Sequence, residues 1–149
     1  MEQDLSEEQI ERVLYDNVIG HMGCHANETT YVIPICYAYD GIYIYGRTYE
    51  GLKLQLLRKN PNVCFQIESI ESMIRWKSVI CWGIFEELTN NEKRNRAIDV
   101  LQNRIVAVVN SKDLLQSQYW PFSTPESKGI IFCIHLHKKT GRYSDSVNY

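Results

Sequence analysis

Strand-like runs follow one another along this chain with few residues between most of them. β-Branched and aromatic residues dominate these runs, which cover residues 18–24, 29–39, 41–48, 62–69, 75–88 and 129–144. Neighbouring parallel strands need a crossover of about a dozen residues or more, whereas tight turns such as Asp40-Gly41 join antiparallel strands into hairpins. The chain is therefore expected to be mainly β, with about six antiparallel strands closed into a barrel and with peripheral α-helices.

The first helix is predicted from its capping residues. Ser6 and Gln9 form a capping box, and Leu5 and Ile10 are placed as a hydrophobic staple. Apolar residues then recur at helical spacing until about Asp16. These signals predict a short amphipathic helix before the first strand of the barrel.

A second helix is predicted over residues 50–60. Its leucines at Leu52, Leu56 and Leu57 share one helical face, and Pro61 cannot continue the helix. The segment therefore connects two strands and is expected to turn one apolar face toward the barrel.

The long run at 75–88 contains a glycine and is followed by the start of a third helix. Gly83 lies in its interior and predicts a bulge or a close approach of another backbone. Thr89 and Glu92 form a capping box for a third helix, expected over residues 90–105. The segment 110–128, which has turn residues and no period, is predicted to be a long surface connection.

Length and composition exclude several classes of protein. A chain of 149 residues with 44% hydrophobic residues is expected to form one domain, residues 1–149. The longest uncharged apolar runs, such as "SVICWGIF", are too short to cross a membrane, and a net charge of −2 gives no reason to expect nucleic acid. The acidic, polar start lacks the apolar core of a secretory signal, so a cytoplasmic location is expected.

The five cysteines are expected to be reduced, buried thiols. Cys24, Cys36, Cys64, Cys81 and Cys133 are odd in number, widely spaced and embedded in apolar runs, and no CxxC pair occurs. This pattern favours small hydrophobic side chains over a disulfide framework or a zinc site.

The junction between a strand and the second helix offers a place for an anion. Arg47, Thr48 and Lys53 surround Gly51, where a helix N-terminus would present unpaired N–H groups. A guanidinium, a hydroxyl and an ammonium could together bind a phosphate by charge-assisted hydrogen bonds. Ordinary turn chemistry with solvated charges is the alternative interpretation.

An apolar strand with a proline suggests a contact for a large planar ligand. Pro34 removes one ladder donor from the strand that contains Tyr31–Cys36, which suggests a sheet edge or an irregularity. Unpaired backbone groups there could contact the polar edge of a flavin, while apolar side chains contact its faces. Alternatively, Pro34 simply ends strand pairing at an edge.

The order of these pieces resembles a known family. A strand "YVIPI", a hairpin, "GRTYEGLKLQLLRKNP", then "VCF" and "WKSVICWG" together resemble the FMN-binding split-barrel proteins of the pyridoxamine 5'-phosphate oxidase superfamily. Within that group the chain is most similar to the small nitroimidazole-resistance (Nim-like) flavoproteins. The resemblance implies a six-stranded antiparallel FMN-binding split barrel.

The resemblance also implies the cofactor and its contacts. The cofactor would be FMN, with its phosphate and ribityl tail against Arg47, Thr48 and Lys53, and with Ser78 as a further polar contact. Arg47 would bind the phosphate directly or merely neutralise it. Backbone contacts to the ring would come from the strand residues Tyr31, Val32, Ile33, Pro34, Ile35 and Cys36.

The implied function is that of an FMN-dependent oxidoreductase. The resemblance implies a homodimer with FMN between the subunits and a small-molecule substrate, an electrophile such as a nitroaromatic. A cofactor-binding protein that holds FMN, haem or a deazaflavin without turnover is the alternative. Oxidation of pyridoxamine phosphate is not expected, because the lone Arg142 is a poor replacement for the arginine-rich C-terminal segment of those oxidases.

Four further residues are weaker candidates. His21 is either near the flavin, as a histidine is in the Nim-like proteins, or an ordinary strand histidine with one hydrogen bond. His135 and His137 have the spacing of a metal chelate but no completing partner, so they are expected to be structural or solvent-facing. Trp120, on the long connection, could cover the ring.

Overall fold

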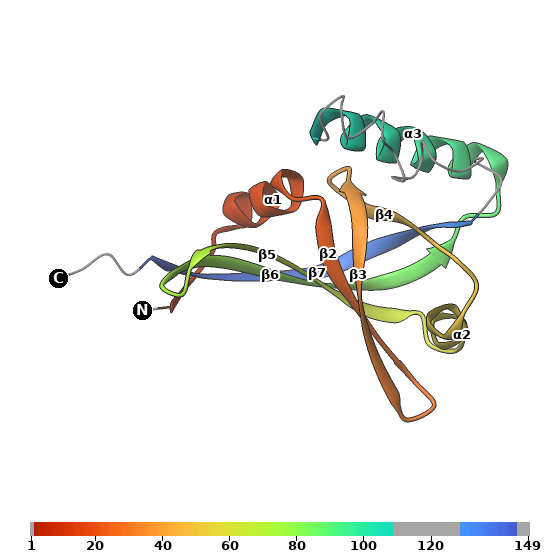
Figure 1. Ribbon diagram of the computed structural model, residues 1–149, viewed down its shortest axis with the longest axis horizontal. Coiled ribbons are helices and arrows are strands. Elements are labelled where there is room, and N and C mark those ends of the chain that lie inside the picture. The colour runs from red at the N-terminus through yellow and green to blue at the C-terminus, as the bar shows by residue number, and fades with distance from the viewer. Residues whose placement is uncertain (1, 109–128, 146–149) are drawn as a thin grey trace.

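The computed structural model describes residues 2–108 and 129–145, which form seven strands and three helices (Figure 1). The strands are β1 (Glu2–Asp4), β2 (Ile19–Ala26), β3 (Thr29–Tyr39), β4 (Tyr43–Thr48), β5 (Asn62–Ser72), β6 (Arg75–Glu87) and β7 (Ile130–Asp145). The helices are α1 (Glu7–Asp16), α2 (Leu52–Lys59) and α3 (Asn91–Val108). Of these helices, none combines the length and the apolar character that a membrane crossing requires.

The strands form one antiparallel sheet that closes on itself. The order is β1-β7-β4-β3-β2-β5-β6, and β6 pairs again with β7 to complete a six-stranded barrel. All seven pairings are antiparallel, which confirms the predicted fold class. The strand that the sequence did not predict is β1, which pairs with residues 142–144 at the far end of β7.

The long pair β6–β7 carries the irregularity predicted at Gly83. Its register shifts there, because Trp82 lies opposite Lys138 and Gly83 lies opposite Leu136. His137 is therefore the extra residue, and the bulge is in β7. A Cβ on Gly83 would lie 2.5 Å from the carbonyl oxygen of His135, so the close backbone approach is also present.

Helix α1 docks on the barrel as its capping residues predict. The Ser6 side chain accepts a hydrogen bond from the Gln9 amide, and the Gln9 side chain accepts one from the Ser6 amide. Leu5 and Ile10 are buried together over Gly141 of β7, where a Cβ would touch both side chains. The staple thus fastens the start of the helix to the barrel.

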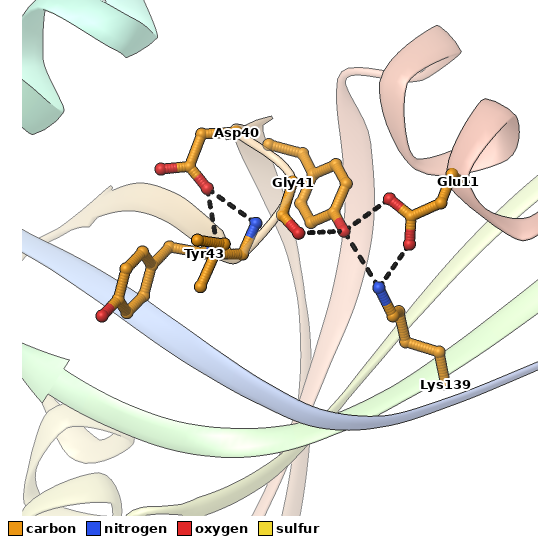
Figure 2. A network of polar contacts seen from close by, with 7 residues as sticks. Glu11, Asp40, Gly41, Tyr43 and Lys139 are labelled. Atoms are coloured by element: carbon orange, nitrogen blue, oxygen red, sulfur yellow. Dashed lines mark hydrogen bonds and ion pairs between the residues drawn. The ribbon is translucent and has the colours of Figure 1, made fainter.

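A polar network holds the other side of α1 (Figure 2). The Tyr39 hydroxyl of β3 donates to Glu11 at 2.7 Å and accepts from Lys139 of β7 at 3.1 Å, and Lys139 also pairs with Glu11. Burial and the hydrogen bond to Glu11 raise the pKa of Tyr39 to about 12. Burial alone would lower the pKa of Lys139, but its bonds to Glu11 and Tyr39 outweigh this and raise it.

Two sequence expectations about the other helices were wrong in detail. In α2 the buried leucines are Leu54, Leu56 and Leu57, whereas Leu52 is 51% exposed. The cap of α3 is Asn90, whose side chain accepts from the Lys93 amide, so the helix begins one residue later than a Thr89 cap would allow. The predicted connection at 110–128 lies outside the described residues.

Apolar packing occurs on both surfaces of the barrel wall. The larger cluster fills the interior and extends under α1 and α2, with Phe65, Phe132 and Ile134 fully buried. The smaller cluster lies outside the wall, where Leu101 of α3 and its neighbours cover Tyr45 of β4 and Ile131 of β7. Helix α3 therefore covers the outer faces of β4 and β7.

Candidate functional site

One edge of strand β3 has no partner among the described strands along residues 29–36. β2 pairs with β3 from Thr29 to Cys36, but β4 pairs only with Tyr37–Tyr39. On its other side β4 pairs with β7 along its whole length, from Tyr43 to Thr48, so the described part of the barrel is split between β4 and residues 29–36 of β3. Pro34 lies on this open stretch, which fits the expectation of a sheet edge.

The backbone groups on the open edge belong to alternate residues. The Tyr37 amide donates to the Val18 carbonyl, so odd-numbered residues of β3 point their backbone groups toward β2. Val32, Pro34 and Cys36 then direct theirs toward the open edge. Two N–H groups and three carbonyls are thus presented along one line, which suits a ligand edge with both acceptors and donors.

The side chains of the predicted ring-binding strand divide between two faces. Val32, Pro34 and Cys36 are exposed on the outside of the barrel, whereas the intervening Tyr31, Ile33 and Ile35 are more buried and belong to the interior cluster. All six residues were predicted to contact the ring through their backbone groups, and that prediction does not depend on where their side chains point.

His21 lies on the same outer face as Pro34. It is directly opposite Pro34 on one side and Gln66 of β5 on the other, and Gln66 is opposite Ile80 of β6. His21 is half-buried. Four strands thus bring one row of side chains to the outer surface, and both interpretations of His21 remain open.

Ser78 belongs to this outer face but is distant from the open edge. It lies on β6, and its hydroxyl accepts from the Gln66 side chain at 3.2 Å. β2 and β5 separate β6 from β3, so three strand spacings, or about 14 Å, lie between Ser78 and β3.

Arg47 and Thr48 are neighbours in β4 and point to opposite faces. The Arg47 guanidinium lies 4.8 Å from the Tyr49 ring centroid, close to Gly129, on the side that α3 covers. Burial lowers the pKa of Arg47 without removing its charge. Arg47 is therefore not brought to the same surface as the Thr48 hydroxyl.

Thr48 faces the other way and is 1% exposed. Its hydroxyl oxygen has no hydrogen-bond partner among the residues that the structure describes. Leaving a buried hydroxyl without a partner costs about 1–3 kcal/mol, so natural structures rarely do so. A polar group from outside the described chain would satisfy it.

The N-terminus of α2 follows directly after Thr48. Gly51 caps it without a side-chain hydrogen bond, no acidic residue lies in the first turn, and a Cβ on Gly51 would meet no atom within 4 Å. Lys53 is half-buried there and forms no ion pair within the described ranges. The start of α2 is therefore open to an anion.

Glu50, which precedes this helix start, is already paired with a cation. Glu50 accepts two hydrogen bonds from Arg58, at 2.8 and 3.0 Å, and Arg58 also binds Glu87. The bonds from Arg58 hold the pKa of Glu50 below its ordinary value. Glu50 therefore presents no unpaired negative charge to an incoming anion.

The cysteines are less uniform than predicted. Cys24, Cys81 and Cys133 are buried and Cys64 is half-buried, but Cys36 is exposed because it faces outward from β3. Burial raises the pKa of Cys81 to about 12 and that of Cys133 to about 11, so both stay protonated near neutral pH. The prediction that all five thiols are buried is therefore wrong for Cys36, which lies on the same outer face as Pro34.

The remaining candidates lie away from this face. His135 and His137 are both exposed on β7, as the solvent-facing interpretation expected, and the His135 ring contacts Tyr43. Trp120 lies outside the described residues. A groove of about 640 Å³ runs between α1 and the ends of β5, β6 and β7, and none of the predicted site residues lines it.

Sequence reasoning missed two residues of the outer face, Gln66 and Glu68. The Gln66 side chain donates to Glu68 at 3.0 Å and to Ser78 at 3.2 Å. Both lie in a run whose alternating apolar residues point inward, so the alternation itself places them outside. Only the strand register reveals that they meet Ser78.

Three comparisons place the chain among known proteins. A protein of unknown function from Rhizobium meliloti (strain 1021) is 32% identical over 151 aligned residues, which cover 93% of this chain and 92% of that protein. The structure of a FAD-binding protein from Mesorhizobium loti matches with a TM-score of 0.77 and 26% identity, covering 97% and 99% of the two chains. A Bacteroides thetaiotaomicron protein provisionally named a 5-nitroimidazole antibiotic resistance protein matches with a TM-score of 0.76 and 18% identity, covering 96% and 87%.

A family model agrees with these likenesses. The model described as pyridoxamine 5'-phosphate oxidase matches residues 6–138, a span that starts at the cap of α1 and ends within β7. The split between β3 and β4 and the helix that follows β4 lie inside it. The chain therefore belongs to the pyridoxamine 5'-phosphate oxidase family and has its split-barrel fold.

Proposed function

We propose that this protein binds FMN and is an FMN-dependent oxidoreductase that reduces a small electrophile such as a nitroaromatic compound. The observation that carries the proposal is the split barrel wall, where the open edge of β3 and the start of α2, which has no side-chain cap, both present backbone polar groups without a partner among the described residues. Such a pair suits a ligand with a planar polar ring and an anionic tail.

The phosphate end of FMN fits the start of α2. Thr48 offers a buried hydroxyl that has no hydrogen-bond partner among the described residues, and Lys53 offers an ammonium. The first turn of α2 offers backbone N–H groups that no carbonyl of the helix can accept. Glu50 is paired with Arg58, so its charge does not repel the phosphate. Arg47 lies on the opposite face, so its proposed part is to raise the positive potential of this corner rather than to touch the phosphate.

The ring of the flavin fits the open edge of β3. The N–H and carbonyl groups of Val32 and Cys36 and the carbonyl of Pro34 would hold its polar edge. A bound flavin would supply the electron transfer itself, and the protein would supply binding, orientation and electrostatics. This division explains why the site needs no nucleophile or paired carboxylates of its own.

A homodimer is part of the proposal because one subunit does not bring all the contacts together. Ser78 lies about 14 Å from β3, too far to share one ring edge with it in the same subunit. The outer face also exposes Ile19, Val32 and Ile80, apolar side chains that a second copy would cover. In a two-fold dimer, Ser78 of one subunit would face the open edge of the other.

The named relatives support the cofactor and the substrate class. The Mesorhizobium loti protein is FAD-binding, and FAD shares the ring and the phosphate-bearing tail on which the fit depends. The Bacteroides thetaiotaomicron protein carries a name that concerns a nitroaromatic drug. FMN is proposed over FAD because the corner at Thr48 and Lys53 suits one terminal phosphate.

The cofactor is tested by mass spectrometry of whatever the purified protein releases on denaturation. The expected product is FMN, with absorption near ~450 nm before release, because the bound cofactor dominates the visible spectrum. Release of FAD instead would overturn the choice of FMN but not the proposal of a flavin. Haem, with its strong band near ~400 nm, or a deazaflavin would overturn the flavin proposal. Turnover is then tested with a reduced nicotinamide and a nitroaromatic, and binding without turnover would leave a cofactor-holding protein.

Lys53 provides a site-specific test. Lys53→Ala should weaken FMN binding by roughly 1.5–3 kcal/mol, the usual worth of a hydrogen bond to a charged group. Lys59→Ala, at the other end of the same helix, is the matched control and should leave the affinity unchanged. Equal affinities of wild type and Lys53→Ala in a fluorescence titration would count against the phosphate site at α2.

A further inference from the structure

Three polar side chains on the outer face of β5 and β6 form a chain of hydrogen bonds that ends at Ser78. Gln66 uses its side-chain nitrogen for two bonds, to Glu68 Oε2 at 3.0 Å and to Ser78 Oγ at 3.2 Å. Gln66 and Glu68 are two apart on β5, and Glu68 is the direct strand partner of Ser78. The three side chains therefore share one face.

Glu68 determines which way the Gln66 amide points. An ionised carboxylate only accepts hydrogen bonds, so it must face the NH₂ group of the amide and not its oxygen. The second hydrogen of that NH₂ group then points to Ser78. The amide oxygen of Gln66 is left as an acceptor with no partner among residues 2–108 and 129–145.

The direction of the Ser78 hydroxyl follows. Its oxygen accepts from Gln66, and the described residues offer it no other hydrogen bond. A hydroxyl has one hydrogen and two lone pairs, so the hydrogen of Ser78 remains to be donated elsewhere. Next to this donor stands the acceptor oxygen of Gln66.

We propose that Gln66 is a positioning residue that, oriented by Glu68, makes Ser78 a hydrogen-bond donor to a carbonyl of the flavin ring. The inference rests on the proposed function, since it concerns how the same cofactor is held. The flavin pyrimidine edge alternates carbonyl acceptors with an N–H donor, and the Ser78 donor beside the Gln66 acceptor is complementary to that order. A donor at a ring carbonyl stabilises the reduced, more negative ring, so this bond raises the reduction potential.

Gln66→Met tests the inference, because Met has a similar volume and no N–H group. Without the bond from Gln66, the Ser78 hydroxyl turns to donate to Glu68, its strand partner. Flavin affinity should fall roughly fivefold, the worth of one neutral hydrogen bond, and the reduction potential should fall. Ser78→Ala should give the same two changes, and the double variant should be no worse than either single variant.

Two controls keep the outcome decisive. Gln102→Met makes the same change on α3 and should alter neither affinity nor potential. Melting of the cofactor-free proteins checks that Gln66→Met still folds, and Ser78→Thr, which keeps the hydroxyl, should retain the wild-type potential.

The results separate this inference from the proposed function. A wild-type protein that binds no flavin would overturn both. Flavin binding by the wild type, together with an unchanged affinity and potential in Gln66→Met, would overturn the inference alone. Additive losses in the double variant would likewise overturn it, because they would mean that Gln66 does not act through Ser78.

Discussion

At Thr48 a buried hydroxyl lacks a partner in the described chain, and this single atom connects stability to binding. Its oxygen has lost water on folding, at a cost of about 1–3 kcal/mol, without gaining a protein donor or hydrogen-bond acceptor in return. A ligand that supplies a phosphate oxygen would accept its hydrogen and offset the cost.

Thr48→Val should therefore separate the two effects. The substitution keeps the shape and removes the hydroxyl, so the cofactor-free protein should be at least as stable as the wild type in urea unfolding. The affinity for FMN should fall about tenfold, the worth of one hydrogen bond to a charged group. Thr48→Ser, which keeps the hydroxyl, should bind FMN within a few-fold of the wild type. A clear loss of stability in Thr48→Val would mean that the hydroxyl already has a partner in the folded chain.

Tyr39 makes the stability of α1 docking depend on alkaline pH. Its pKa is raised from 10.0 to about 12, mainly by burial and by the bond to Glu11, so the folded state retains the phenol proton that the unfolded state loses. A raised pKa gives stability that is complete below pH 10 and is lost as the pH rises toward 12. One such group contributes at most about 1.4 kcal/mol per pH unit in this window.

Tyr39→Phe should lower the free energy of unfolding at pH 8 by about 1–2 kcal/mol, since it removes the hydrogen bond that the hydroxyl donates to Glu11 and the one that it accepts from Lys139. Between pH 10 and 12 the variant should lose less stability than the wild type. Burial also raises the pKa of Tyr37 and Tyr45, so some slope should remain. Denaturant unfolding at several pH values measures both effects, and parallel pH profiles would contradict the assigned role of Tyr39.

At the scale of elements, local turn chemistry decides which parts of the fold can be predicted. The Asp40 side chain accepts hydrogen bonds from the amides of Ile42 and Tyr43, and Gly41 has a φ of 98°. These two residues are therefore enough to predict the β3–β4 hairpin. The β2–β3 hairpin turns through Asn27 and Glu28, both with positive φ. A glutamate there gives no recognisable signal.

Helix faces and short strands depend on the rest of the molecule. Helix α2 has leucines at 52, 54, 56 and 57, which allow two apolar faces, and only packing against the barrel selects the one that leaves Leu52 exposed. β1 has three polar residues and forms only by pairing with the end of β7, where Arg142 also forms ion pairs with Glu2 and Asp4. Neither outcome is encoded locally.

The candidate site likewise has a part that local sequence predicts and a part that it does not. The strand and the helix start were predictable because their residues are contiguous, as in Tyr31–Cys36 and Thr48–Lys53. The chain Glu68–Gln66–Ser78 was not, because it depends on the register between β5 and β6. The opposite directions of Arg47 and Thr48 follow from the two-residue period of a strand, once the strand is known to include both.

Gly83 tests how far the bulged pair β6–β7 can adjust. A Cβ there would lie 2.5 Å from a backbone oxygen and 2.7 Å from the Ile134 side chain, and the backbone atom belongs to a paired strand that cannot move freely. Gly83→Ala should lower the free energy of unfolding by about 1–3 kcal/mol, as overpacked sites do.

Gly51→Ala is the matched control, since its Cβ meets nothing within 4 Å and its φ of 163° is extended. It should change stability by less than about 0.5 kcal/mol. Denaturant unfolding of the two variants gives the comparison. Equal stabilities would mean that β6 and β7 yield at the bulge and that the close approach imposes no constraint.

At the scale of the whole molecule, one outer face of the barrel exposes apolar side chains from three of its strands, β2, β3 and β6. Ile80, which is 37% exposed, ends the row of Pro34, His21 and Gln66. Ile19 is 58% exposed and Val32 63%, and each lies two residues along its strand from a member of this row. Single exposed apolar residues are common, and the polar His21 and Gln66 lie among these three, so an interface on this face would bury apolar and polar side chains together. A second copy of the chain is the occupant that would also bring Ser78 to the open edge of β3.

Ile80→Lys should therefore affect assembly and cofactor binding together. If this face is the dimer interface, a lysine at residue 80 would have to be buried without a partner, which a stable dimer does not tolerate. Light scattering after size-exclusion chromatography should show the wild type as a dimer and the variant as a monomer. FMN affinity should fall at least tenfold in the monomer, because the partner's contacts to the ring are lost.

Ile42→Lys, in the β3–β4 turn, adds the same charge at a residue that is 57% exposed, and it should remain dimeric with full affinity. A monomeric Ile80→Lys variant that still binds FMN like the wild type would show that one subunit holds the whole site. If the Ile80→Lys variant is still a dimer, the interface lies on another face of the barrel. The exposed apolar side chains of β2, β3 and β6 would then need a different partner.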